Sequence, residues 1–260
     1  MAKNLPVIDI VVVGGLDPGG GAGLFRDVAT AAALGAQAHA VGTAWTEQAH
    51  GAHQVEPRDP DAVASALARA VAGLAPGAVK IGMAAGPATM RAIMDGLASY
   101  AGPVVVDPVL ATSRGGSLWS AEPRALLPLL RRATLVTPNA PELAALSGRP
   151  VASVPEAELA GQAMVRDDGL AAVLVKGGHL AESEDTVVDL LIAPDGVRPY
   201  RHARAPGPSP RGTGCALATA VAVGLARGST LDQAIQQAIG WIEGAIARAH
   251  PVGAERHLDG

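Results

Sequence analysis

Short apolar runs alternate with longer alanine-rich segments along nearly the whole chain. Continuous apolar runs of strand length are typical of strands that are covered on both faces, because neither face has to meet water. We therefore predict a buried, mainly parallel sheet. The strand candidates are residues 7–13, 38–44, 78–83, 104–107, 134–137 and 172–176.

The segments between these runs have helical periodicity. Within residues 61–73, Val63, Leu67 and Val71 recur at four-residue steps and would form one apolar face. Residues 122–132 end in paired arginines, which stabilise the C-terminal end of a helix. Strands that alternate with helices in this way predict a three-layer α/β/α sandwich.

An antiparallel hairpin is predicted at one side of this sheet. Residues 186–193 and 197–202 flank Pro194-Asp195-Gly196, whose composition favours a tight turn. No internal repeat or convincing linker interrupts the pattern. Because α/β folds often reach this length undivided, we expect residues 1–260 to form a single domain.

The composition of the chain argues against two classes of partner, nucleic acid and membranes. Net charge is −4, and Lys3, Lys80 and Lys176 are scattered, so the sequence has no basic face for nucleic acid. No uncharged apolar stretch approaches the roughly 18 residues of a membrane span, so we expect no membrane partner. The single cysteine excludes an internal disulfide, and the chain is predicted to be cytoplasmic.

One short run, Arg211-Gly212-Thr213-Gly214-Cys215, directly precedes the helix-favouring residues 216–227. Glycines before a helix let the backbone curl and direct unpaired N–H groups at one point, where the helix dipole adds positive charge. We therefore predict an anion site at this turn. The alternative is an ordinary helix cap with a small buried cysteine.

Polar residues follow the strand candidates, at the ends where open α/β sheets bind ligands. The first candidate is followed by a glycine-rich run, residues 14–23, with Arg26 and Asp27 beyond it. The run is neither a P-loop, because no Lys-Ser/Thr pair follows, nor a regular dinucleotide fingerprint. A turn that merely brings strand and helix together is the alternative interpretation.

In this order, the strand-end segments resemble the hydroxymethylpyrimidine and phosphomethylpyrimidine kinases of thiamine biosynthesis, within the ribokinase superfamily. The resemblance extends from Val11 to about Ala249 and implies a ribokinase-like fold. Five motifs carry it: Asp17-Pro18 with Gly20-Gly21-Ala22-Gly23 and Asp27; Gln48; Val79-Lys80-Ile81-Gly82-Met83; Asp107-Pro108-Val109 with Thr137-Pro138-Asn139 and Glu142; and Lys176-Gly177-Gly178-His179 with Gly212-Thr213-Gly214-Cys215.

The resemblance implies roles for these positions. The residues that match those holding the pyrimidine are Gly15, Asp27, Gln48, Met83 and Val109. A carboxylate and a carboxamide can read ring nitrogens and an amino group, while thioether and aliphatic groups flank the ring. The alternative for Met83 and Val109 is packing in the core. For Asp27 the alternative is a carboxylate favoured at a helix N-terminus, and for Gln48 it is an exposed side chain without a ligand.

The nucleotide side is also implied by the resemblance. Asp107 and Glu142 match metal positions and, with Asn139, would organise hydrated Mg²⁺ around the phosphates of ATP. Lys176, Asn139 and Thr137 are expected to contact the nucleotide. Without the resemblance, Asn139 and Glu142 are typical of a helix cap and its capping-box partner.

Phosphoryl transfer depends on positioning and charge stabilisation. We expect the Gly212, Thr213, Gly214 and Cys215 turn to hold the transferring group. A helix N-terminus lowers a thiol pKa, so the hypothesis is that Cys215 is partly thiolate at neutral pH and assists as a base.

Departures from the family pattern bear on the substrate. Pro210 and Arg211 replace the usual residues of the last turn, and Phe25-Arg26 stands where Gln-Ala is frequent. Because Arg211 and Arg26 add charge near the site, we predict a preference for an already phosphorylated pyrimidine alcohol. A pyridoxal-type kinase and a non-catalytic pyrimidine-binding sensor are the competing hypotheses. The resemblance also suggests a homodimer.

Overall fold

The structure is a computed structural model that describes residues 7–47, 54–112, 115–180, 185–253 and 255–259. Within these residues, nine strands form one sheet in the order β3-β2-β1-β4-β5-β6-β7-β8-β9. Strands β2, β1, β4, β5, β6 and β7 pair in parallel, whereas β3, β8 and β9 are antiparallel to their neighbours. The strands are β1 (Ile8–Leu16), β2 (Ala36–Glu47), β3 (Gln54–Pro57), β4 (Ala78–Ile81), β5 (Val104–Val106), β6 (Leu135–Val136), β7 (Val173–Val175), β8 (Thr186–Ala193) and β9 (Gly196–Ala203).

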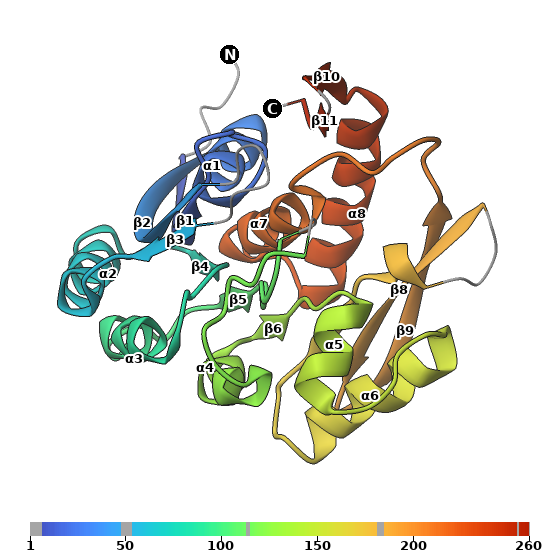
Figure 1. Ribbon diagram of the computed structural model, residues 1–260, viewed down its shortest axis with the longest axis horizontal. Coiled ribbons are helices and arrows are strands. Elements are labelled where there is room, and N and C mark those ends of the chain that lie inside the picture. The colour runs from blue at the N-terminus through green and yellow to red at the C-terminus, as the bar shows by residue number, and fades with distance from the viewer. Residues whose placement is uncertain (1–6, 48–53, 113–114, 181–184, 254, 260) are drawn as a thin grey trace.

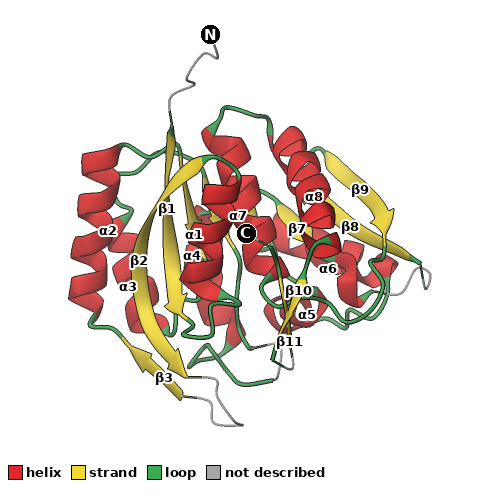
Figure 2. Ribbon diagram, turned by 90° about the horizontal axis from the view of Figure 1, so that it is seen from above, coloured by secondary structure: helices red, strands yellow, loops and turns green. Residues whose placement is uncertain are grey.

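Helices cover both faces of this sheet (Figures 1 and 2). One face carries α2 (Pro60–Leu74), α3 (Pro87–Gly96), α4 (Leu127–Arg132), α5 (Ala140–Ser147) and α6 (Val154–Arg166). The other carries α1 (Gly23–Ala33), α7 (Thr213–Ala226) and α8 (Leu231–Ala247). The predicted three-layer α/β/α architecture is therefore confirmed.

The side-chain alternation of the central strand explains the two layers of core. In β1, Val11 and Val13 belong to the cluster beneath α2 and α3, while Ile10 and Val12 belong to the cluster beneath α1 and α7. All four are fully buried. Because successive residues of a strand point to opposite faces, a run that is apolar throughout requires a cover on each side.

The antiparallel hairpin is confirmed as β8–β9, with Ala193 paired to Gly196 across the turn. Residues 122–132 form a short 3-10 helix, η1 (Pro123–Leu126), before α4, because Pro128 cannot donate a hydrogen bond in the middle of one continuous helix. A second short 3-10 helix, η2 (Gly177–His179), follows β7.

Two features were not predicted from the sequence. Strand β3 pairs antiparallel with the end of β2 at the far edge of the sheet. Near the end of the chain, β10 (His250–Val252) and β11 (Glu255–His257) form a small hairpin. No described helix is both long and apolar enough to cross a membrane.

Candidate active site

The turn at residues 211–215, here called the anion turn, begins helix α7 at the edge of the sheet where the parallel strands end. Gly212 is the N-cap residue, with φ of 81°, and no side chain caps the helix. This left-handed conformation is easy only for glycine, and an added Cβ at Gly212 would overlap the carbonyl of Gly21. The first N–H groups of the helix are thus left to bind a ligand.

Lys176 and Asp107 lie against this turn. A Cβ added to Gly214 would be 3.1 Å from Lys176 Nζ and 3.7 Å from Asp107 Oδ2. Lys176 Nζ donates a hydrogen bond of 2.7 Å to Asp107 Oδ1, and it lies 3.8 Å from Glu142 Oε2. Asp107 and Glu142 raise the pKa of Lys176, which is therefore a cation beside the anion turn.

Thr137 and Asn139 form hydrogen bonds with the two carboxylates next to Lys176. The buried Thr137 hydroxyl donates to Asp107 Oδ1 at 3.3 Å. Asn139 and Glu142 form a capping box at the start of α5: Glu142 N–H donates to Asn139 Oδ1 at 2.9 Å, and Asn139 N–H donates to Glu142 Oε2 at 2.8 Å. Burial raises the pKa of Glu142 to about 7, although Lys176 opposes this effect.

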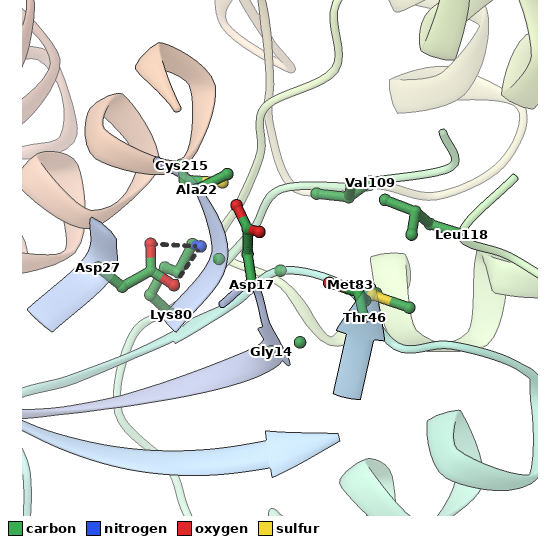
Figure 3. A pocket seen from close by; sticks show the side chains of 13 residues that line it. Gly14, Asp17, Ala22, Asp27, Thr46, Lys80, Met83, Val109, Leu118 and Cys215 are labelled. Carbon is green, nitrogen blue, oxygen red and sulfur yellow. Dashed lines mark hydrogen bonds and ion pairs between the residues drawn. The ribbon is translucent and has the colours of Figure 1, made fainter. Parts of the chain in front are cut away.

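A cleft opens beside the anion turn, and its empty space, including open solvent at its mouth, is about 420 Å³. Figure 3 shows that its lining changes character from one end to the other: Asp27, Lys80 and Cys215 lie at one end, while Met83, Val109 and Leu118 lie at the other. Such a lining suits a heterocycle that has one polar edge. The remaining lining residues are Gly14, Gly15, Asp17, Ala22, Gly23, Thr46 and Gly82.

Asp27 is held by a buried ion pair. Lys80 Nζ lies 2.8 Å from both Oδ1 and Oδ2 of Asp27, and the Thr219 hydroxyl donates to Oδ1 at 2.9 Å. Asp27 and Thr219 are fully buried, and Lys80 is 1% exposed. Burial raises the pKa of Asp27, and Lys80 opposes that rise, so the ammonium stabilises the ionised carboxylate.

The expected lowering of the Cys215 pKa is wrong. Cys215 lies at the cleft in the first turn of α7, but burial around its sulfur raises its pKa to about 11. The nearby Lys80 lowers it, although by less than burial raises it. Desolvation disfavours the thiolate more strongly than the helix terminus and this cation favour it.

The two arginines near the site have different surroundings. The Arg211 guanidinium pairs with Asp17 Oδ2 at 2.9 Å and with Glu255 Oε2 at 3.2 Å, which joins the first glycine-rich loop to the terminal hairpin. Arg26 packs against Gly212 and is only 5% exposed. Its Nε is buried with no hydrogen-bond partner among the described residues.

The structure therefore brings most of the predicted site residues to one edge of the sheet. Gln48 lies outside the described residues. Asp17, Lys80, Thr46 and Thr219 were missed as individual contributors. A lysine inside the apolar run Val79-Lys80-Ile81 is a sequence signal that could have identified a buried charge, since lysine is almost never buried without a partner.

The fold and this cleft define a small-molecule kinase of the ribokinase-like class, and comparisons with known proteins agree. The structure is similar to an ADP complex of Bacillus subtilis pyridoxal kinase, with a TM-score of 0.87, 25% identity and 97% of each chain covered. It is also similar to phosphomethylpyrimidine kinase from Clostridium difficile 630, with a TM-score of 0.79, 29% identity, and coverage of 92% of this chain and 99% of that one.

The sequence comparisons specify the family. Residues 17–258 match the phosphomethylpyrimidine kinase family. The chain is 39% identical over 241 residues to the hydroxymethylpyrimidine/phosphomethylpyrimidine kinase of Rhizobium meliloti, covering 91% of this chain and 90% of the relative. The corresponding enzyme of Escherichia coli is 33% identical over 261 residues, with 96% and 97% covered. This chain belongs to the phosphomethylpyrimidine kinase family.

Proposed function

We propose that this protein transfers the terminal phosphoryl group of ATP to 4-amino-5-hydroxymethyl-2-methylpyrimidine, to its monophosphate, or to both, in thiamine biosynthesis. One observation carries the proposal: the uncapped start of α7 lies against the Lys176–Asp107 pair and beside a cleft that could hold a heterocycle. Phosphoryl transfer needs such a combination of anion-binding N–H groups, a fixed cation and a substrate pocket. Family membership supports the same reaction.

In this proposal the chain positions its substrates and stabilises charge. The N–H groups of Gly212, Thr213, Gly214 and Cys215 bind the oxygens of the transferring group, and Lys176 offsets their charge. The ring lies between Asp27 and the apolar end of the cleft, with Gly15, Met83 and Val109 around it. Its hydroxymethyl group then points toward α7. Thr137 acts indirectly, because its hydroxyl orients Asp107.

Mg²⁺ fits the donor set of this site. Asp107 and Glu142 are buried carboxylates that share one lysine, so the cluster retains negative charge when both are ionised. Among the described residues no group of three or more His, Cys, Asp or Glu side chains forms a metal site, and Mg²⁺ bound mainly by phosphates and water needs only one or two carboxylates. When bound, Mg²⁺ neutralises charge on the phosphates of ATP. Asp107 and Glu142 would hold it, with Asn139 beside them.

Preference for the phosphorylated substrate is supported by Arg26. Burial lowers the pKa of this guanidinium, and its Nε lacks a partner, so an anion beside the turn would satisfy a costly buried group. Arg211, in contrast, already pairs with two carboxylates. We expect Arg26→Gln to raise the KM for the monophosphate at least about tenfold and to change the KM for the free alcohol far less. Equal effects on both substrates would contradict this assignment.

The test of the main proposal is a comparison of ATP consumption with three acceptors: the pyrimidine alcohol, its monophosphate and pyridoxal. A higher kcat/KM for the pyrimidines supports the proposal. A higher value for pyridoxal would favour the pyridoxal-type alternative. The similarity to solved pyridoxal kinases is the reason to include this acceptor. Tight pyrimidine binding without ATP consumption would favour a sensor.

We also infer a cytoplasmic homodimer. Three large apolar side chains on two neighbouring elements are exposed: Phe25 (49%) and Val28 (38%) on α1, and Trp45 (58%) on β2. A second copy of the chain would cover these side chains and remove their apolar surface from water. Light scattering on the purified protein tests this, and a monomer at micromolar concentration would contradict it.

A further inference from the structure

The Asp27–Lys80 ion pair has a feature that phosphoryl transfer does not require. Both side chains lie at the polar end of the cleft and are almost completely buried (Figure 3). Two opposite charges buried together are costly to desolvate and are often less stabilising than apolar residues of the same size. Their presence on the wall of a ligand cleft therefore suggests a role in recognition.

The hydrogen bonds of the Asp27 carboxylate leave part of its acceptor capacity unused. An ionised carboxylate offers about four acceptor positions and no donor. Asp27 Oδ1 accepts from Lys80 and from Thr219, whereas Oδ2 accepts from Lys80 alone among the described residues. One acceptor position on Oδ2 thus remains for a ligand.

We propose that Lys80 and Thr219 are positioning residues that hold Asp27 as an ionised, acceptor-only group, so that the cleft selects a ring carrying an N–H donor. The proposal rests on the function proposed above and adds a basis for its specificity. It identifies the amino substituent of the heterocycle as the group that Asp27 reads. Lys80 and Thr219 act through Asp27.

Each positioning residue has its own part. Lys80, on β4, fixes both oxygens and supplies the compensating charge. Thr219, on α7, holds Oδ1 and so prevents rotation of the carboxylate. If Lys80 were removed, Asp27 would be an uncompensated buried charge, and burial would favour its protonated form. The other titratable groups that act on Asp27 are Asp107, Arg26 and Cys215.

The experiment measures ligand binding by calorimetry with the full-length protein. Its ligands are 4-amino-5-hydroxymethyl-2-methylpyrimidine and the analogue that lacks the amino group. Thr219→Val removes the hydroxyl at nearly constant volume, and Thr219→Ser retains it as the matched control. Lys80→Met removes the charge. Thermal unfolding of every variant verifies that it is folded.

We expect Thr219→Val to weaken binding of the amino compound about tenfold, because the carboxylate is no longer held in the orientation that accepts from the amino group, and Thr219→Ser to stay within about twofold. Lys80→Met should weaken it about 100-fold at the lowest pH tested, and the loss should become smaller as pH rises and Asp27 ionises. The wild-type protein, titrated in parallel, corrects for ionisation of the ligand itself. The analogue should bind wild type weakly and be insensitive to Thr219→Val.

Three results would overturn the inference: unchanged affinity in folded Thr219→Val, affinity of Lys80→Met that falls as pH rises, or equal binding of the two ligands by wild type. If Lys80→Met does not fold, the comparison of Thr219→Val with Thr219→Ser still tests the inference. A wild-type protein that phosphorylates the pyrimidine yet binds both ligands equally would leave the proposed function standing. Failure of wild type to bind or phosphorylate the pyrimidine would instead overturn the proposed function.

Discussion

The Lys176 ammonium lies 2.7 Å from the Asp107 carboxylate, although the two residues are 69 positions apart in the sequence. Asp107 directly follows β5 and Lys176 directly follows β7, on either side of β6. Parallel strands end at the same edge of a sheet, so the topology brings these opposite charges together. Gly214 of the anion turn packs against both of them.

This arrangement predicts a catalytic effect for Lys176→Met. Loss of the cation removes charge stabilisation beside the transferring group, so kcat should fall about 100-fold, as for the loss of one preorganised donor. Affinity for the pyrimidine should change little, because Lys176 is not among the residues that line the cleft proposed to hold the ring. Steady-state kinetics with varied ATP, together with calorimetry for the pyrimidine, tests both parts. Lys176→Arg, which retains the charge, should recover part of kcat, and a Met variant as active as wild type would contradict the assignment.

The high pKa of Cys215 predicts a modest role for its thiol. With a pKa raised to about 11 by burial, the thiolate is a minor species at pH 7.5. Cys215→Ala should therefore retain kcat within about tenfold of wild type, because the backbone N–H groups remain. Gly212→Ala should lower kcat more, about 100-fold, because an added Cβ collides with the Gly21 carbonyl and the native φ is 81°.

Gly240→Ala is the matched control for that comparison. Gly240 lies within α8, and an added Cβ meets nothing within 4 Å. The change should raise the free energy of unfolding by up to about 1 kcal/mol and leave kcat unchanged. A loss of kcat beyond about 1,000-fold in a folded Cys215→Ala variant would restore the thiolate hypothesis.

Much of the fold could be predicted from the sequence because the parallel strands are apolar throughout and alternate with amphipathic helices. The hairpin was also predictable, since Pro194-Asp195-Gly196 has strong turn chemistry. Strand β3 was not, because Gln54-Val55-Glu56-Pro57 has neither the length nor the composition of a buried strand. Its pairing with β2 depends on a neighbour that the local sequence does not specify.

Prediction of the site was limited in a different way. Glycine turns and strand-end polar residues are local signals, so Asp107, Lys176 and Gly212 could be identified as candidates. The partner of a buried charge is a tertiary contact: nothing local connects Lys80 with Asp27 or Arg211 with Glu255. The pKa of Cys215 was predicted with the wrong sign because desolvation depends on packing from several elements at once.

His202 predicts how stability depends on pH. Its Nε2 lies 3.2 Å from Asp189 Oδ2, and Asp189 Oδ1 accepts from Gly177 N–H at 2.6 Å. The hydrogen bond to Asp189 raises the pKa of His202, with a further contribution from Glu243, whose Oε1 is 3.7 Å from Nδ1. The protonated imidazolium therefore stabilises the folded state.

The sign of the effect follows from linkage. Because the folded pKa exceeds the unfolded value of about 6.5, the stabilisation is complete below that pH and disappears as pH rises through the folded pKa. The difference in free energy of unfolding between wild type and His202→Gln should thus be larger at pH 6 than at pH 9. Urea denaturation at both pH values measures it, and a difference that grows with pH would contradict the assignment.

Arg211→Gln tests whether this residue serves the structure or the substrate. Its guanidinium pairs with Asp17 and Glu255, and its backbone N–H donates to the Arg256 carbonyl at 2.8 Å, so it joins the glycine-rich loop, the anion turn and the β10–β11 hairpin. The Gln variant loses both ion pairs but retains the backbone contact. We expect faster hydrogen exchange in β10, β11 and the loop at Asp17, because these segments lose a shared partly buried cation.

Kinetics distinguish the role of Arg211 from that of Arg26. Because the charge of Arg211 is already balanced, Arg211→Gln should change the KM for the alcohol and for its monophosphate by similar factors. Arg26→Gln should affect the monophosphate selectively, since the buried Nε of Arg26 lacks a hydrogen-bond partner among the described residues. If Arg211→Gln selectively raised the KM for the monophosphate while hydrogen exchange of the hairpin stayed unchanged, Arg211 rather than Arg26 would be the phosphate-binding residue.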